Sequence, residues 1–187
     1  MNAIDHYMNR RTVIVGDVNS GKTVLTLKIL NCFLKAGYAE KIAVIDLAPD
    51  KTQGIGGKLT VPQDQSLLYL TTSIAAPRLT GRDDDHIRQL AEKNAVAIEN
   101  LFKKILSEKR NILFINDATL YLQAGDFERF TQLLDTASTQ IINVYYGHMF
   151  PHSRLTDREK RLTQRLIKTC SQIIHMPLDG KRALQPC

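Results

Sequence analysis

The sequence contains no tryptophan, only 3 cysteines, and no apolar run approaching the ~18 residues that span a bilayer. Its cysteines are odd in number, far apart and never spaced as C-x-x-C, which predicts isolated thiols and excludes a disulfide framework or a paired-cysteine zinc site. Residues 1–11 also lack the apolar stretch of a signal sequence. These absences argue against secreted scaffolds and membrane-spanning proteins, and we expect a cytoplasmic protein.

The composition is that of an ordinary globular domain. The chain has 187 residues, 43% of them hydrophobic, and a formal net charge of +6 from 25 Lys and Arg against 19 Asp and Glu. This length predicts a single domain over residues 1–187 with one core. The mild positive charge permits an acidic partner but identifies none, because any nucleotide-binding protein carries some positive charge.

Apolar segments with strand and helix periods alternate along the whole chain. Short continuous apolar runs predict buried strands at 12–15, 42–45, 67–70, 112–115, 141–146 and 173–176. Helices are predicted after residue 22, after the acidic run 83–85, near 126–137 and near 157–170. Such alternation predicts an α/β fold, a three-layer, mostly parallel sheet with helices on both faces, with its ligand site at the carboxyl ends of the strands.

Residues 16–23 read G-D-V-N-S-G-K-T, which matches G-x-x-x-x-G-K-[ST] between a predicted strand and a predicted helix. Backbone amides in such a loop surround phosphate oxygens, and the positive end of the following helix adds to the attraction. The residues expected to bind phosphate are Gly16, Asn19, Ser20, Gly21, Lys22 and Thr23. Lys22 is expected to face solvent and to reach the β- and γ-phosphates, acting in catalysis, while the Thr23 hydroxyl ligates Mg²⁺.

Two aspartates stand at the ends of predicted strands. Asp46 closes the strand at 42–45, and Asp117 follows the strand at 112–115 after Asn116. We expect Asp117 to hold Mg²⁺ opposite Thr23, on a strand beside the loop strand. We expect Asp46 to activate the attacking nucleophile or to make a second metal contact. The alternative for each is a cap on a strand end or turn.

The chain resembles one class of P-loop proteins in three segments, which are residues 16–23, Leu30-Asn31, and residues 45–50 leading into the glycines at 54–57. That class contains signal-recognition GTPases, chromosome-partition and division-site ATPases, dethiobiotin synthetase and polynucleotide 5′-hydroxyl kinases. The resemblance covers about the first third of the chain. It implies a P-loop NTPase fold and a bound nucleoside triphosphate with Mg²⁺.

The match to individual members is incomplete. The kinases often carry Leu-Asn on the loop helix and D-x-D-x-G-Q after the next strand. In this chain Asp46 matches the first acid of that second motif, and Ala48 replaces the second acid. Gln53-Gly54 has the last pair in reverse order, after an insertion. The partition ATPases carry D-x-D-P, which Asp46 and Pro49 match. They also have an extra lysine early in the loop, where this chain has Asp17.

Two functions follow from the resemblance and the motif. One is an ATPase that uses hydrolysis as a switch or motor and whose state a protein partner reads. The other is a kinase that transfers the γ-phosphoryl group to a hydroxyl of a polynucleotide or small molecule. The guanine signature N-K-x-D is absent from the sequence, so we assume ATP. Substrate, partner and oligomeric state are not predicted.

Further candidates lie outside the loop. The long connection 48–66 and the loop 71–82, with Arg78 and Arg82, are expected to border the phosphate site. Residues 156–159 read as a capping box. Around it, Arg154, Arg158, Arg161 and Arg165 share one helical stripe, which predicts a solvated face or, alternatively, a lid over phosphate or a nucleic-acid contact.

Overall fold

The computed structural model describes residues 3–51, 54–61 and 66–177. Six strands form one sheet: β1 (Arg11–Gly16), β2 (Ile42–Asp46), β3 (Leu68–Thr71), β4 (Ile112–Asn116), β5 (Thr139–Tyr145) and β6 (Gln172–His175). Their order in the sheet is β3-β2-β4-β5-β1-β6, and every pair is parallel. The carboxyl ends of all six strands therefore meet at one edge, as the sequence predicted.

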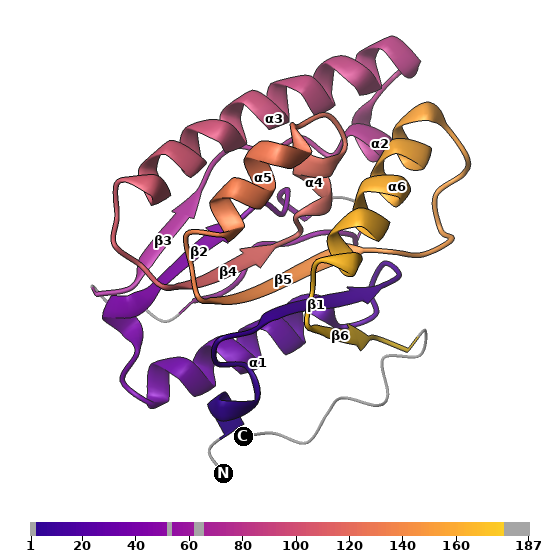
Figure 1. Ribbon diagram of the computed structural model, residues 1–187. Helices are drawn as coiled ribbons and strands as arrows, with labels where there is room; N and C mark the ends of the chain where they lie inside the picture. Colours follow the sequence, from indigo (N-terminus) through magenta and orange to yellow (C-terminus); the bar gives the residue numbers. More distant parts are fainter. Residues whose placement is uncertain (1–2, 52–53, 62–65, 178–187) are drawn as a thin grey trace.

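The helices cover both faces of this sheet (Figure 1). They are α1 (Lys22–Lys35), α2 (Pro77–Thr80), α3 (Asp84–Leu106), α4 (Thr119–Leu122), α5 (Phe127–Leu134) and α6 (Arg154–Lys168), with short 3-10 turns at Ala3–His6 and Ala39–Lys41. Helix α1 packs on one face, and α3 to α6 pack on the other (Figure 1). This three-layer arrangement confirms the predicted fold class.

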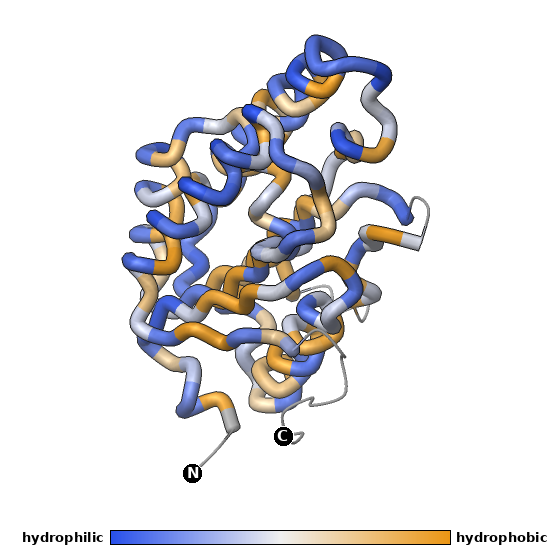
Figure 2. The backbone as a smooth tube through the Cα atoms, turned by 90° about the vertical axis from the view of Figure 1, so that its right-hand side faces the viewer, coloured by the Kyte–Doolittle hydropathy of each residue, from blue (hydrophilic) through white to orange (hydrophobic). Residues whose placement is uncertain are grey.

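Alternate residues of each strand serve the two cores. In β1, Val13 and Val15 join the core beneath α3 to α6, whereas Ile14 joins the core beneath α1. The same alternation runs through β2, β4 and β5, whose residues are all buried, because helices cover both faces of a parallel sheet. Figure 2 shows the result, with hydrophobic residues gathered in the strands and hydrophilic residues along the outer helices.

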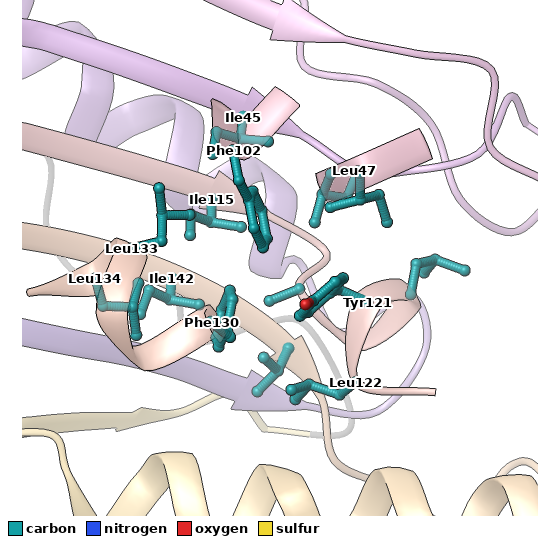
Figure 3. Packing of buried hydrophobic residues seen from close by; sticks show 14 of the residues in the cluster. Ile45, Leu47, Phe102, Ile115, Tyr121, Leu122, Phe130, Leu133, Leu134 and Ile142 are labelled. Carbon is teal, nitrogen blue, oxygen red and sulfur yellow. The ribbon is translucent and has the colours of Figure 1, made fainter. Parts of the chain in front are cut away.

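Three aromatic rings fill the larger core. Tyr121 of α4 contacts Phe102 of α3 at a ring-centroid distance of 4.8 Å and Phe130 of α5 at 5.7 Å (Figure 3). The Tyr121 hydroxyl is satisfied, since it donates to Glu99 (3.1 Å) and accepts from the amide of Asp126 (3.1 Å). These contacts bind three helices to one another above the sheet.

The structure departs from the sequence-based elements in several places. The short helices α2 and α4 were not predicted. Helix α6 begins three residues earlier than expected and is capped by Ser153, whose hydroxyl accepts the amide of Thr156 (3.1 Å), so the predicted capping box at 156–159 is wrong. Cys170 is a free thiol, as expected, and Cys187 lies outside the described residues.

The position of β4 is also different from the prediction. We expected the strand that carries Asp117 to lie beside the loop strand β1, but β5 lies between them. Parts of the predicted long connection, including Gln53 and residues 62–65, lie outside the described residues. Among the described helices, none is both long enough and apolar enough to cross a bilayer.

Candidate functional site

The loop between β1 and α1 has the backbone geometry that a close approach to an anion requires. A Cβ on Gly16 would lie 2.6 Å from Ser20 Oγ and 2.8 Å from Met176 Cβ, so no larger residue fits there. Gly21 has φ +88°, a left-handed conformation that glycine adopts without a steric penalty. Asn19 is also left-handed, with φ +56°.

Helix α1 begins without a side-chain cap. Its N-cap position is Gly21, whereas α3, α5 and α6 are capped by Asp83, Asp126 and Ser153. The first amides of any helix have no partner within the helix. At α1 these amides face a cavity of about 380 Å³ that residues 18–24 help to line. The positive end of the helix is therefore open to an anion.

Lys22 is folded back onto the loop. Its Nζ donates to the carbonyl oxygens of Gly16 (3.0 Å) and Asp17 (2.6 Å), so the expectation that it faces solvent is wrong. Burial lowers the pKa of Lys22, and the charges of Asp117 and Asp17 oppose this effect. The ammonium group lines the cavity while held by weak carbonyl acceptors that an anion can replace.

Asp17, which stands where the partition ATPases carry lysine, anchors the loop. Its carboxylate accepts the amides of Val18 (2.7 Å) and His148 (3.0 Å), which ties the loop to the segment after β5. Burial raises the pKa of Asp17, but these amides and the charge of Lys22 outweigh it, and the pKa is lowered overall. A Cβ on residue 147 would lie 2.4 Å from the Asp17 carboxyl carbon, which explains why this residue is glycine.

A buried polar chain runs from Thr23 into the sheet. The Thr23 hydroxyl donates to Asn116 Oδ1 (3.4 Å), and Asn116 Nδ2 donates to Asp46 Oδ1 (2.8 Å). Asn143 Nδ2 also donates to Asn116 Oδ1 (2.7 Å). Asn116 is not among the residues predicted for the site, although an amide at the end of an otherwise apolar strand was a usable signal.

Asp46 is enclosed. The residue is fully buried and accepts four hydrogen bonds, from the amides of Ala48 (3.2 Å) and Leu59 (2.6 Å), the Tyr69 hydroxyl (2.7 Å) and Asn116. Burial, with the Asp46 carboxylate as hydrogen-bond acceptor, raises the pKa of Tyr69. Asp46 is not among the residues that line the cavity. This arrangement favours an anchoring role over the predicted activation of a nucleophile.

Asp117 lies where the sequence analysis expected a metal-binding acid. It lines the cavity with Lys22 and Thr23, and its φ of +55° is unusual for a residue other than glycine. The Asn143 side chain supports this turn by accepting the Asp117 amide (2.8 Å). Burial raises the pKa of the Asp117 carboxyl, while Lys22, a hydrogen bond from Thr119 and Arg78 oppose the rise.

The donor set fits Mg²⁺. Thr23 can direct a lone pair toward a cation because its proton goes to Asn116, and Asp117 supplies a carboxylate in the same cavity. No group of three or more His, Cys, Asp or Glu side chains forms a metal site within the described residues. Mg²⁺ binds through one or two protein groups together with water and phosphate oxygens, and Thr23 and Asp117 are two such groups.

The arginine stripe of α6 does not reach the cavity. Arg158 donates to the Gly125 carbonyl (2.7 Å), and Arg165 pairs with Glu128 (2.9 Å) and lies over the Phe127 ring. Arg154 and Arg161 are exposed. None of these four arginines lines the cavity beside the loop. Two of them fasten α6 to the α4–α5 region, and the stripe agrees better with the predicted solvated face than with the alternative of a lid over phosphate.

Arg78 does line the cavity, as one of the two loop arginines named from the sequence. Its Nη1 pairs with Glu159 Oε1 at 2.9 Å, and its guanidinium lies over the rings of Phe150 (3.8 Å) and Tyr145 (5.1 Å). The sequence predicts Glu159 as part of a capping box, but the residue is buried. Its spacing from Leu155, Leu162 and Leu166 on the apolar stripe was the signal for burial.

Comparison with family models and with curated protein sequences found no match. Among solved structures, the chain is similar to the flagellar accessory protein FlaH from Methanocaldococcus jannaschii, with a TM-score of 0.48, 12% identity, and coverage of 90% of this chain and 71% of that chain. It is also similar to Pif1 helicase from Candida albicans, with a TM-score of 0.41 and 14% identity. That match covers 90% of this chain and 36% of the helicase chain.

Proposed function

We propose that this protein binds a nucleoside triphosphate, assumed to be ATP, together with Mg²⁺, and hydrolyses it. One observation carries the proposal: α1 begins without a side-chain cap, and its amides face a cavity that also holds Lys22. The motif of residues 16–23 and the left-handed Gly21 support it. A triphosphate is the anion that this loop sequence and geometry are suited to bind.

The roles of the site residues follow from their positions. The loop backbone from Gly16 to Thr23 would surround the β-phosphate, and Lys22 would exchange its carbonyl acceptors for the β- and γ-phosphate oxygens. Mg²⁺, held by Thr23 with Asp117 beside it, would neutralise phosphate charge. Asp46 would act through Asn116 to orient the Thr23 hydroxyl, and so it is a positioning residue in this proposal.

We further propose that hydrolysis serves a switch or motor. The segment 47–59, of which Pro49, Ile55 and Lys58 line the cavity, leaves the end of β2 and is fastened to Asp46. A change in the phosphates could thus be transmitted to this surface segment, where a protein partner would read it. A cytoplasmic location and a single domain remain part of this proposal.

The kinase alternative is favoured by a different observation. A second hollow of about 760 Å³ adjoins the cavity and shares Arg78, Gln123 and Phe150 with it. A hydroxyl-bearing substrate in this hollow would lie next to the proposed phosphate site. An assay with γ-labelled ATP, with and without an RNA or DNA 5′-hydroxyl end, separates the two: label released as free phosphate supports the ATPase, and label on the oligonucleotide supports the kinase.

The first test of the proposal is Lys22→Ala. We expect this variant to bind Mg·ATP at least about tenfold more weakly by calorimetry, because a charged hydrogen bond to phosphate contributes about 1.4 kcal/mol or more. Circular dichroism should be unchanged, since the lysine contacts only loop carbonyls and Ser20. The exposed Lys28→Ala is the matched control on the same helix. Equal affinity of Lys22→Ala and wild type would disprove the phosphate-loop assignment.

A further inference from the structure

Arg78 lies at the wall of the proposed nucleotide cavity that also carries Asp117. It sits on the one-turn helix α2 after β3, and its side chain is 13% exposed. Lys22, Arg78 and Asp117 all line this cavity, so the two cations reach it from different elements, α1 and α2. Lys22 is the residue expected to reach the terminal phosphates, and Arg78 is therefore directed at the same end of a triphosphate.

The guanidinium of Arg78 is oriented but not saturated. Of its five N–H groups, one hydrogen bond is found within the described residues, from Nη1 to Glu159. The rings of Phe150 and Tyr145 hold the guanidinium by its face, which leaves its edge available for further acceptors. A planar fork with free donors is the arrangement that binds phosphate oxygens in pairs.

Glu159 is a poor permanent partner for this cation. It is 2% exposed, and its other oxygen accepts a hydrogen bond from Gln123 Nε2 at 2.9 Å. Burial raises the pKa of Glu159 to about 7, although Arg78 and Gln123 oppose the rise. A doubly charged terminal phosphate is a stronger hydrogen-bond acceptor than the Glu159 carboxyl group, which is partly protonated near pH 7.

We propose that Arg78 binds the terminal phosphate of the nucleotide and gives the site its preference for a triphosphate over a diphosphate. This inference rests on the proposed function. In the structure Arg78 is held by Glu159 of α6, and on binding a triphosphate it exchanges Glu159 for the phosphate. The exchange leaves Glu159 of α6 with its hydrogen bond from Gln123 but without the direct ion pair to Arg78, and so couples that helix to the number of phosphates.

The test compares two variants that both lack the buried carboxylate. Removing Arg78 alone would leave Glu159 buried without its cation and endanger folding. We therefore compare Glu159→Gln with Arg78→Met/Glu159→Gln, in which methionine keeps an unbranched stem between the rings. The pair Arg161→Ala/Glu159→Gln is the matched control, because Arg161 is exposed and lies outside the cavity. ATP and ADP affinities are measured by calorimetry with Mg²⁺.

We expect Arg78→Met/Glu159→Gln to lose at least about tenfold in ATP affinity and less than about twofold in ADP affinity, relative to Glu159→Gln. The Arg161 control should change neither. An equal loss for ATP and ADP, or no loss, overturns the role of Arg78 while the proposed function stands. Absence of ATP and ADP binding in wild type overturns the proposed function and this inference together.

Discussion

Neighbouring polar residues at the strand ends differ sharply in how they are held. Asp46 is surrounded by four donors and shut away from the cavity, whereas Asp117 lines the cavity from a left-handed turn that Asn143 supports. Hydrogen bonding and access, not residue type, therefore separate an anchoring carboxylate from one that can meet a metal ion.

Asparagine substitutions should separate these two aspartates. Asp117→Asn should weaken nucleotide binding in Mg²⁺ but barely alter binding in chelator, because the carboxylate is needed only for the cation. Asp46→Asn should lower the free energy of unfolding by about 1–3 kcal/mol, since its NH2 group then faces two donors, either those of Ala48 and Asn116 or those of Leu59 and Tyr69. Calorimetry and denaturant unfolding measure the two effects. A fully stable Asp46→Asn with abolished turnover would restore the predicted catalytic role.

Glu159 should make stability depend on pH. Its pKa in the folded protein is raised to about 7, above its ordinary value, so the native state keeps a proton that the unfolded chain releases as the pH rises. The stabilisation is present below about pH 4.5 and is lost as the pH rises to about 7. We expect the unfolding free energy of wild type relative to Glu159→Gln to fall by on the order of 2 kcal/mol between about pH 5 and about pH 7.5.

Denaturant unfolding at both pH values makes this measurement. Glu92→Gln is the control, because the Glu92 side chain is 61% exposed on α3. A difference between wild type and Glu159→Gln that stays constant with pH would contradict the assignment of a raised pKa to Glu159.

At the scale of elements, the described residues of the segment 47–59 are held in place by hydrogen bonds with two charged side chains, Lys58 and Asp46. Lys58 Nζ donates to the Ala48 carbonyl (2.9 Å), the Thr71 hydroxyl (3.0 Å) and the Thr72 carbonyl (3.3 Å). Asp46 holds the amides of Ala48 and Leu59 near the two ends of the same segment. These side-chain bonds add to the backbone hydrogen bonds from Leu47 to Asn116 (2.9 Å) and from Gly57 to Pro49 (3.2 Å).

Lys58→Met should loosen this segment without unfolding the sheet. We expect the Leu59 amide to exchange its hydrogen at least about tenfold faster, because loss of the three Lys58 contacts favours local opening. The amides of β4 should keep their protection. Lys51→Met, which removes an exposed lysine from the same segment, is the control. Unchanged exchange at Leu59 would mean that Asp46 alone holds the segment closed.

At the scale of the whole molecule, one sheet connects both cores. Each central strand contributes alternate side chains to the core under α1 and to the core under α3 to α6, so neither core can form without the strands of the other. This predicts a single cooperative unfolding transition, as expected for one domain over residues 1–187.

Thermal unfolding followed by far-ultraviolet and near-ultraviolet circular dichroism should therefore give coincident transitions. Mg·ATP at about 100 times its dissociation constant should raise the midpoint by roughly 5–10 °C, since binding then adds about 2.7 kcal/mol. Two separated transitions would show that the chain contains two folding units.

The sequence by itself determined the strands, the four helices α1, α3, α5 and α6 that flank them, and the loop of residues 16–23. These are local features, because apolar period and glycine position act within a few residues along the chain. It also identified Asp117 and Arg78 as polar residues near the expected edge of the sheet.

Only the tertiary structure decided what those polar residues contact. The strand order, with β5 between β1 and β4, sets which strand ends meet, and it brings Asn116 between Thr23 and Asp46. Likewise Glu159 meets Arg78 across 81 positions of sequence, because α2 and α6 converge above the sheet. Hydrogen bonds and burial depend on such long-range neighbours, which no local pattern of residues specifies.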